Sequence, residues 1–403
     1  ASIILTPTAY NNGEALCVKP SDGSGDFDFS RATDATRINS LGLVETIGIN
    51  LPRINYENGC GSWLFEPQST NLITYSSDYT NEWINTGTTD VISSTMLSPN
   101  GLDYSTLLVG DVATVSTKRI RNTVIPIAST AHTFSVFVKS ANRTYIQIIN
   151  SGDAQGYANF DVSNGIVGNT GSKTTANITP LNNNWYRCEV STDATTSNGG
   201  FMIYLVDSNT ASFGAAGTST DGVYIWGAML EQGNISSYIP TSGSTVTRNQ
   251  DLCTNGGSLA SINSTEGVLY AEIAALADGV GTRTISVSNG TNNNSITIRY
   301  TTNSGRINAF IVASGFIQFS ANISGVSVLD FNKVAIKYSL NDMALWINGV
   351  KVATDTSGTM PLGLNEINFT RGDGANKFFG KTKCLAVWKE ALSDSELQSL
   401  TTI

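Results

Sequence analysis

The chain has 403 residues, of which 14% are charged and 40% are hydrophobic. This apolar share can fill real cores, so the low charge does not indicate disorder, and the length suffices for two or three domains. The acidic excess gives a net charge of −9, which argues against nucleic-acid binding because a duplex binder needs a basic surface.

Residues 1–66 differ in character from the rest of the chain. They contain short β-like pieces and too little apolar material for a core of good size. We therefore expect an N-terminal docking or oligomerisation segment that packs on the next domain, a sister subunit or a larger assembly. Its charged residues offer many ion pairs: Asp28, Arg31, Asp34, Arg37, Glu45, Arg53, Glu57 and Glu66.

Residues 67–247 predict a first β-sandwich of the jelly-roll type. Apolar and polar residues alternate with a period of two, which is typical of half-buried strands, and turn formers such as Asn and Gly separate these runs. Trp83 and Trp185 fall on the apolar faces and are expected in the core. The clearest alternating stretches are 133–140, 145–149, 157–162, 185–190, 201–206 and 223–230.

Residues 253–403 predict a second sandwich, and residues 236–251 before it, rich in turn formers, predict a linker. Asn348-Gly349 lies between two alternating runs and predicts a two-residue hairpin turn, beside Trp346, which is expected in the core. Ser393 followed by Glu396 is a capping box, so we expect a short helix there. The predicted fold class is therefore all-β, with two sandwiches in series.

Three stretches resemble segments of known families. Residues 29–72 are similar to a segment that recurs in structural proteins of tailed bacteriophages, with the runs FSRATDATRIN, GLVE, PRINY, LFEP and TNL. Residues 224–249 resemble the end of carbohydrate-binding-module-like jelly rolls in the same proteins. Residues 345–351 and 385–397 resemble the closing strands of laminin-G/concanavalin-A-like lectin domains.

The resemblance implies a bacteriophage virion appendage, a fibre or decoration protein on head or tail. Such proteins are commonly homotrimers. The implied partners are host-surface polysaccharide, held weakly with avidity from multiple copies, and other virion proteins bound through the N-terminal segment. Two alternatives remain: a purely structural virion component that binds no sugar, and a polysaccharide-degrading spike.

Catalysis is not expected. His132 is the single histidine, so a Ser–His–Asp or Cys–His arrangement would have to use it, and it begins an apolar strand. Glycoside hydrolysis needs two carboxylates, but Glu272 stands alone on its strand and Glu366 lies in a loop-like stretch.

Sugar binding needs aromatic faces for the pyranose ring and polar groups for the hydroxyls. Tyr145, Tyr157 and Tyr204 lie in the middle strands, where a jelly roll has its concave face. Asp153 and Gln155, in the loop between two of those strands, can add polar contacts. These five residues are the predicted carbohydrate-binding site.

No cofactor is expected apart from a possible structural calcium ion. Loops with Asp suit a hard cation, and the candidate ligands are Asp26 with Asp28, or Asp221 with Glu231. The five cysteines are odd in number and far apart, which favours reduced thiols. No long apolar run or secretion signal is apparent, so we expect synthesis in the host cytoplasm, no membrane insertion, and a place on the virion surface.

Overall fold

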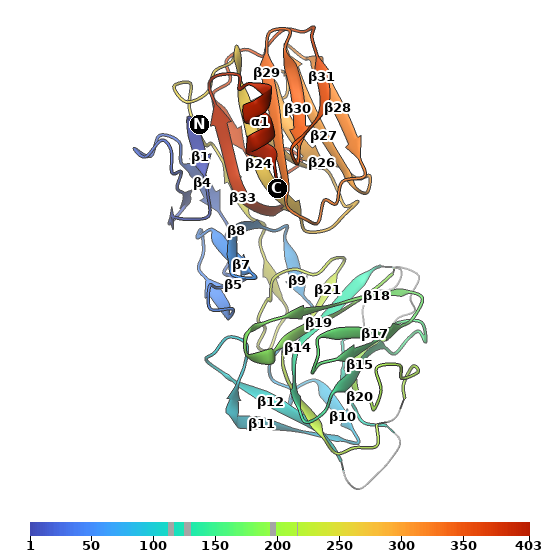
Figure 1. Cartoon of the computed structure of the whole chain (residues 1–403). Coiled ribbons are helices and arrows are strands. Elements are labelled where there is room, and N and C mark those ends of the chain that lie inside the picture. Colours follow the sequence, from blue (N-terminus) through green and yellow to red (C-terminus); the bar gives the residue numbers. More distant parts are fainter. Residues whose placement is uncertain (112–116, 125–129, 194–198, 216) are drawn as a thin grey trace. The chain divides into compact units, whose positions relative to one another are not determined.

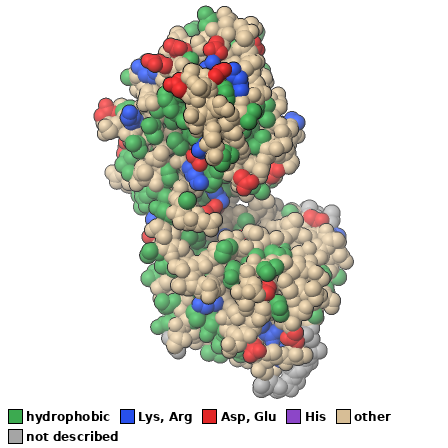
Figure 2. All heavy atoms as spheres, viewed as in Figure 1, with side chains coloured by type: hydrophobic (Ala, Val, Ile, Leu, Met, Phe, Trp, Pro, Cys, Tyr) green, Lys and Arg blue, Asp and Glu red, His purple; other side chains and the backbone are tan. Residues whose placement is uncertain are grey.

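The computed structural model describes residues 1–403 except 112–116, 125–129, 194–198 and 216 (Figure 1). The described residues form 33 strands, one α-helix and one 3₁₀ turn, so the predicted all-β class is confirmed. They divide into two compact units: unit 1 contains 1–34, 47–67 and 249–403, and unit 2 contains 35–46 and 68–248. In the view of Figure 2, uncharged polar side chains and backbone cover most of the surface.

Unit 2 is a β-sandwich of two six-stranded sheets. Phe134 from one sheet stacks on Phe201 from the other, with ring centroids 5.1 Å apart, and Trp83 and Trp185 are buried as expected. The first sheet has the order β10 (Trp83–Thr86), β13 (Arg119–Asn122), β20 (Phe201–Leu205), β15 (Tyr145–Asn150), β16 (Tyr157–Asp161) and β17 (Ile166–Thr170). The second has the order β11 (Thr88–Leu97), β12 (Tyr104–Gly110), β21 (Gly222–Gln232), β14 (His132–Ala141), β19 (Tyr186–Thr192) and β18 (Thr174–Pro180).

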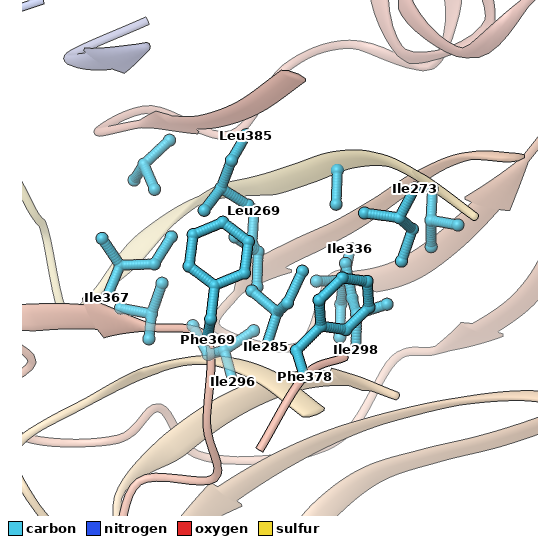
Figure 3. Close-up of a cluster of buried hydrophobic side chains, with 14 of the residues drawn as sticks. Leu269, Ile273, Ile285, Ile296, Ile298, Ile336, Ile367, Phe369, Phe378 and Leu385 are labelled. Atoms are coloured by element: carbon cyan, nitrogen blue, oxygen red, sulfur yellow. The ribbon is translucent and has the colours of Figure 1, made fainter. Parts of the chain in front are cut away.

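The second sandwich lies in unit 1. Figure 3 shows its core, in which Leu269 and Leu385 of one sheet meet Ile285, Ile298 and Phe369 on the other side. One sheet runs β31 (Val350–Asp355), β30 (Met343–Ile347), β29 (Asn332–Ser339), β24 (Glu266–Ala275), β33 (Gly380–Trp388), β8 (Cys60–Phe65), β7 (Arg53–Glu57). The five-stranded sheet runs β28 (Phe316–Ser324), β27 (Arg306–Ala313), β26 (Ser295–Tyr300), β25 (Arg283–Ser288), β32 (Glu366–Asn368).

Most of the N-terminal segment extends the sheets of unit 1. Both β1 (Ile3–Leu5) and β8 pair with β33, and β4 (Phe27–Ser30) pairs with β23 (Leu252–Thr254). β2 (Tyr10–Asn11) and β3 (Glu14–Ala15) continue the small sheet of β4. Residues 35–46 belong to unit 2, whose remaining strand pairs are β5 (Ala35–Ile38) with β6 (Val44–Ile47) and β9 (Ser69–Asn71) with β22 (Val246–Arg248).

The expectation of a linker at residues 236–251 is wrong. Tyr238 and Ile239 are buried in an aromatic cluster with Phe137 and Trp226. The backbone carbonyl of Tyr238 accepts a hydrogen bond from Thr36. The prediction relied on the turn-forming composition of residues 236–251. Two apolar side chains, Tyr238 and Ile239, are nevertheless enough to anchor this segment in the core.

A buried ion-pair network organises the N-terminal part of unit 1. Asp251 accepts from Arg31 Nη1 at 3.0 Å and also pairs with Arg53. Arg53 Nη1 donates to Glu66 at 2.7 Å, and the Glu66 backbone N–H donates to Asp251 at 2.8 Å. All four side chains are at most 4% exposed, so each charge depends on the others for its compensation.

The local predictions in the second sandwich are confirmed. Asn348 and Gly349 have φ of 50° and 81° and connect β30 to β31, and Trp346 is buried. Ser393 accepts from the Glu396 backbone and caps α1 (Asp394–Thr401). No helix of the described residues is long and apolar enough to cross a bilayer.

Replacing Asp251 with Ala should lower the free energy of unfolding of unit 1 by about 3–5 kcal/mol, because it leaves Arg31 and Arg53 buried without their shared counter-ion. Urea unfolding measures the change. Glu57→Ala is the control, since it removes a carboxylate that is 49% exposed and paired with Lys381, and should cost less than about 1 kcal/mol. Equal effects of the two substitutions would contradict the role given to the network.

Candidate functional site

The outer face of the β10–β13–β20–β15–β16–β17 sheet carries the predicted tyrosines. Successive side chains on a strand point to opposite faces, so Ile146 and Ile148 enter the core while Tyr145, Gln147 and Ile149 point outward. We call this surface the tyrosine face. It consists of Arg119, Arg121, Tyr145, Gln147, Ile149, Tyr157, Asn159, Met202 and Tyr204.

Three strands bring the three tyrosines together. Tyr145 on β15, Tyr157 on β16 and Tyr204 on β20 belong to one cluster with Ile149 and Met202. Tyr204 lies opposite Gln147 in the strand pairing, and Tyr157 lies opposite Ile149. Tyr204 is 6% exposed, whereas Tyr145 and Tyr157 are half-buried, so the latter two can offer ring surface to a ligand.

The loop at residues 207–215 covers the middle of the tyrosine face. Asn159 donates to the Ala211 carbonyl at 2.8 Å, and Gln147 accepts from the Gly214 backbone at 2.8 Å. Both side chains are fully buried. Phe213 meets the ring of Tyr157 edge-on, with centroids 5.9 Å apart. The sequence did not predict that this loop packs on the sheet, because no local pattern shows which distant residues a loop contacts.

Two arginines flank the tyrosines on β13. Arg119 Nη1 donates to the Tyr204 hydroxyl at 2.6 Å, and its Cζ lies 5.6 Å from the centroid of that ring. Arg121 lies opposite Met202 on the same face and is half-buried, and its side chain makes no hydrogen bond or ion pair with the described residues. Sequence reasoning missed both residues, although the alternation Arg-Ile-Arg within a strand places two cations on one face.

The two predicted polar residues lie at one end of this sheet, in the loop between β15 and β16. Asp153 forms a 2.8 Å ion pair with Lys173. Gln155 is exposed, and its Oε1 accepts from the Ser172 hydroxyl at 2.8 Å. These contacts tie the loop to residues 172–173. Both side chains thus already have partners within the loop region.

The calcium pairing of Asp221 with Glu231 is wrong. The two residues lie at opposite ends of β21, and ten strand residues span roughly 30 Å, whereas ligands of one calcium ion lie within about 2.6 Å of it. Glu231 is buried and accepts from Ser69 and Ser236.

The other predicted calcium ligands lie in unit 1. Asp26 accepts from the Cys17 backbone N–H, and Asp28 accepts from Asn255. No group of three or more His, Cys, Asp or Glu side chains in the described residues is arranged to hold a metal ion. All five cysteines are free thiols.

His132 is buried at the start of β14, outside the tyrosine face. Its Nδ1 lies 2.9 Å from the Thr130 carbonyl oxygen and can donate to it. Burial lowers the pKa of His132 below its usual value, and the Thr130 contact opposes this shift only in part. The ring is therefore neutral at pH 7 and belongs to the packing of the sandwich.

Comparisons with known proteins gave no match among family models and none among curated proteins. Among solved structures, the chain is similar to the CBM40 of an IT-sialidase from Ruminococcus gnavus, with 20% identity, a TM-score of 0.32, and coverage of 37% of this chain and 94% of that chain. A putative carbohydrate-binding protein from Bacteroides ovatus gives 11% identity, a TM-score of 0.28, and coverage of 83% and 85%. The mouse laminin α1 domains LG4-5 give 11% identity, a TM-score of 0.24, and coverage of 69% and 89%. Likenesses of this size carry no functional argument.

Acid should destabilise unit 2 partly through His132. Because burial lowers its pKa, the unfolded chain binds more protons than the folded one as the pH falls below about 6.5, and stability is lost across that window. His132→Gln removes the titration, so we expect a shallower decline between about pH 7.5 and about pH 5.5. Urea midpoints measured at several pH values check this, and identical slopes for the two proteins would contradict it.

Proposed function

We propose that this chain is a glycan-binding protein and that the tyrosine face contacts the saccharide. One observation carries the proposal: Tyr145, Tyr157 and Tyr204, on three different strands, converge on one outer sheet face beside Arg119 and Arg121.

The chemistry of this face suits a sugar. The apolar side of a pyranose ring packs on an aromatic ring, and half-buried Tyr145 and Tyr157 offer such rings at low cost in side-chain entropy. Arginine supplies several hydrogen-bond donors in a fixed geometry for hydroxyl or carboxylate oxygens, and Arg121 has these donors unengaged by the described residues. With the 207–215 loop over the middle of the face, the contact area is small, so single-site binding is weak and depends on avidity.

The proposed setting is a bacteriophage virion appendage, with the N-terminal segment bound to other virion proteins. The support for this is the resemblance of residues 29–72 to phage structural proteins. We propose binding without cleavage, because the acids near the tyrosine face are engaged: Asp161 accepts from the Ser163 and Asn164 backbone N–H groups.

The binding test titrates purified full-length chain with oligosaccharides from candidate host surfaces and with sialyllactose, to which the Ruminococcus gnavus CBM40 is bound in one of the similar structures. Tyr157→Ala and Arg119→Ala should each weaken binding at least about tenfold, equivalent to about 1.4 kcal/mol. Tyr104→Ala is the matched control, because Tyr104 is 52% exposed on the opposite sheet of the same unit, and it should bind as the wild type does.

Released reducing ends are scored in the same samples. Release would favour the polysaccharide-degrading alternative. Absence of binding to every saccharide by well-folded protein would favour a structural virion component. Binding that survives both Tyr157→Ala and Arg119→Ala would place the saccharide elsewhere on the chain.

The proposed homotrimer is tested separately. Light scattering of the purified chain should give a mass of about three times 42.7 kDa. A mass of a single chain at micromolar concentration would contradict self-assembly of the trimer. It would leave the glycan-binding proposal standing, since the tyrosine face is complete within one chain.

A further inference from the structure

The five-stranded sheet of unit 1 also has an outer face, and a polar row crosses it. Thr284 on β25, Arg299 on β26 and Asn308 on β27 are direct neighbours in the strand pairing, and Asn322 on β28 follows. The residues next to them in sequence, among them Ile285, Ile298 and Ala309, point into the core. The polar row therefore lies on the side of the sheet that faces away from the core.

Three consecutive members of this row have polar atoms that lack a hydrogen-bond partner among the described residues. Thr284 Oγ1, Arg299 Nε and Asn308 Oδ1 are buried and make no hydrogen bond to the described residues. Thr284 is fully buried, and Asn308 is 3% exposed. Buried polar groups are nearly always hydrogen-bonded, so three neighbouring exceptions set this row apart from the rest of the sheet.

Arg299 stands apart from the other arginines of unit 1. Arg31, Arg53, Arg283, Arg306 and Arg371 each hydrogen-bond to the protein. The Arg299 side chain makes no hydrogen bond or ion pair to the described residues, and its Cζ lies 4.4 Å from the centroid of the Phe310 ring. This cation–π contact holds the guanidinium beside the ring, and its N–H donors stay available for a ligand.

The loop at residues 369–378 forms a rim beside this row. The Ser286 hydroxyl, on β25, donates to the Thr370 carbonyl at 2.7 Å. The backbone N–H of Thr284 donates to the Asn376 carbonyl at 3.0 Å. Both bonds start from β25 and end on the loop, so they hold the loop against the strand that carries the first member of the row.

The same loop brings a second arginine near Arg299. Burial, and then the positive charge of Arg371, lower the pKa of Arg299. The two guanidinium groups therefore repel each other electrostatically. Arg371 is itself paired with Asp373 at 2.6 Å. Because that carboxylate is already engaged, the charge of Arg299 is left uncompensated by the described residues.

We propose that this face binds an acidic saccharide, with Arg299 holding the carboxylate or sulfate of one sugar unit and the exposed Asn322 contacting one of its hydroxyl groups. A guanidinium that has no hydrogen bond or ion pair with the described residues matches a planar carboxylate or a sulfate. The chain has a net charge of −9, so its overall electrostatic potential repels anions. An anion therefore binds only where the local positive charge exceeds this negative potential.

The uncharged groups around Arg299 favour a saccharide over a bare anion. Asn322 offers an exposed amide, and Ser320 offers an exposed hydroxyl in the next row of the same face. Neighbouring strands lie about 4.8 Å apart, close to the width of one pyranose ring. A sugar lying across the strands can therefore meet several of these groups at once.

This inference does not rest on the tyrosine face, which belongs to the other unit. The test titrates the full chain with three oligosaccharides of one backbone: uronate-containing, sulfated and neutral. The acidic forms should bind at least about tenfold more tightly than the neutral form, and the difference should shrink with added salt. Comparison of the uronate and sulfate arms identifies which anion the face prefers.

Arg299→Ala should remove the preference for the acidic forms, and Arg299→Lys should restore it in part, because lysine keeps the charge without the planar fork. Lys383→Ala is the matched control, since Lys383 lies over the Phe331 ring at 4.2 Å on the other sheet of this sandwich. It should bind as the wild type does. Thermal unfolding of each variant verifies that the protein is folded.

Equal binding of acidic and neutral forms would overturn the inference, as would an Arg299→Ala variant that keeps the acidic preference. No binding of any form by folded wild-type chain would also overturn it, and would assign the unpartnered atoms to buried water. Tyr157→Ala should leave the acidic preference unchanged. If Tyr157→Ala alone loses binding, the saccharide binds at the tyrosine face, and the result does not support binding at the face of Arg299.

Discussion

The architecture of unit 1 depends on the burial of Asp251 between Arg31 and Arg53. Arg31 and Asp251 are 220 positions apart, yet neither can be buried without the other, because an unpaired charge in a protein interior is strongly destabilising. Strand pairing of β4 with β23 and of β8 with β33 brings the backbone of the same segments together. The N-terminal residues of this unit and its C-terminal sandwich therefore form one folding unit.

Both sandwiches follow the same rule. Each sheet gives one face to a core of Ile, Val, Leu and Phe, and alternation along the strand places a second set of residues on the outer face. The chain has few charges, and two outer faces each carry an arginine whose side chain has no hydrogen bond or ion pair with the described residues. Arg121 in unit 2 and Arg299 in unit 1 both have this position. In both proposals, the arginine at this position supplies the N–H donors that bind the saccharide.

The features that could be predicted are those set by near neighbours in sequence. The Asn348-Gly349 turn, the capping box of Ser393 and Glu396, and the burial of Trp185 depend on a few adjacent residues. Period-two alternation also placed Tyr145, Tyr157 and Tyr204 in middle strands, and the structure gathers them into one cluster. The pairing of Asp221 with Glu231 failed because residues at the two ends of one long strand cannot meet.

The sequence by itself determined the all-β class, the local turns and the face of each strand that points inward, because these follow from backbone preferences and from the pattern of apolar side chains. The tertiary structure alone decided which strands are neighbours. That choice buries Tyr238 in an aromatic cluster, lays residues 207–215 over Gln147 and Asn159, and aligns Thr284, Arg299 and Asn308 in one row. Such contacts join residues distant in sequence, and their energies depend on the packing of the whole sheet, so no local pattern reveals them.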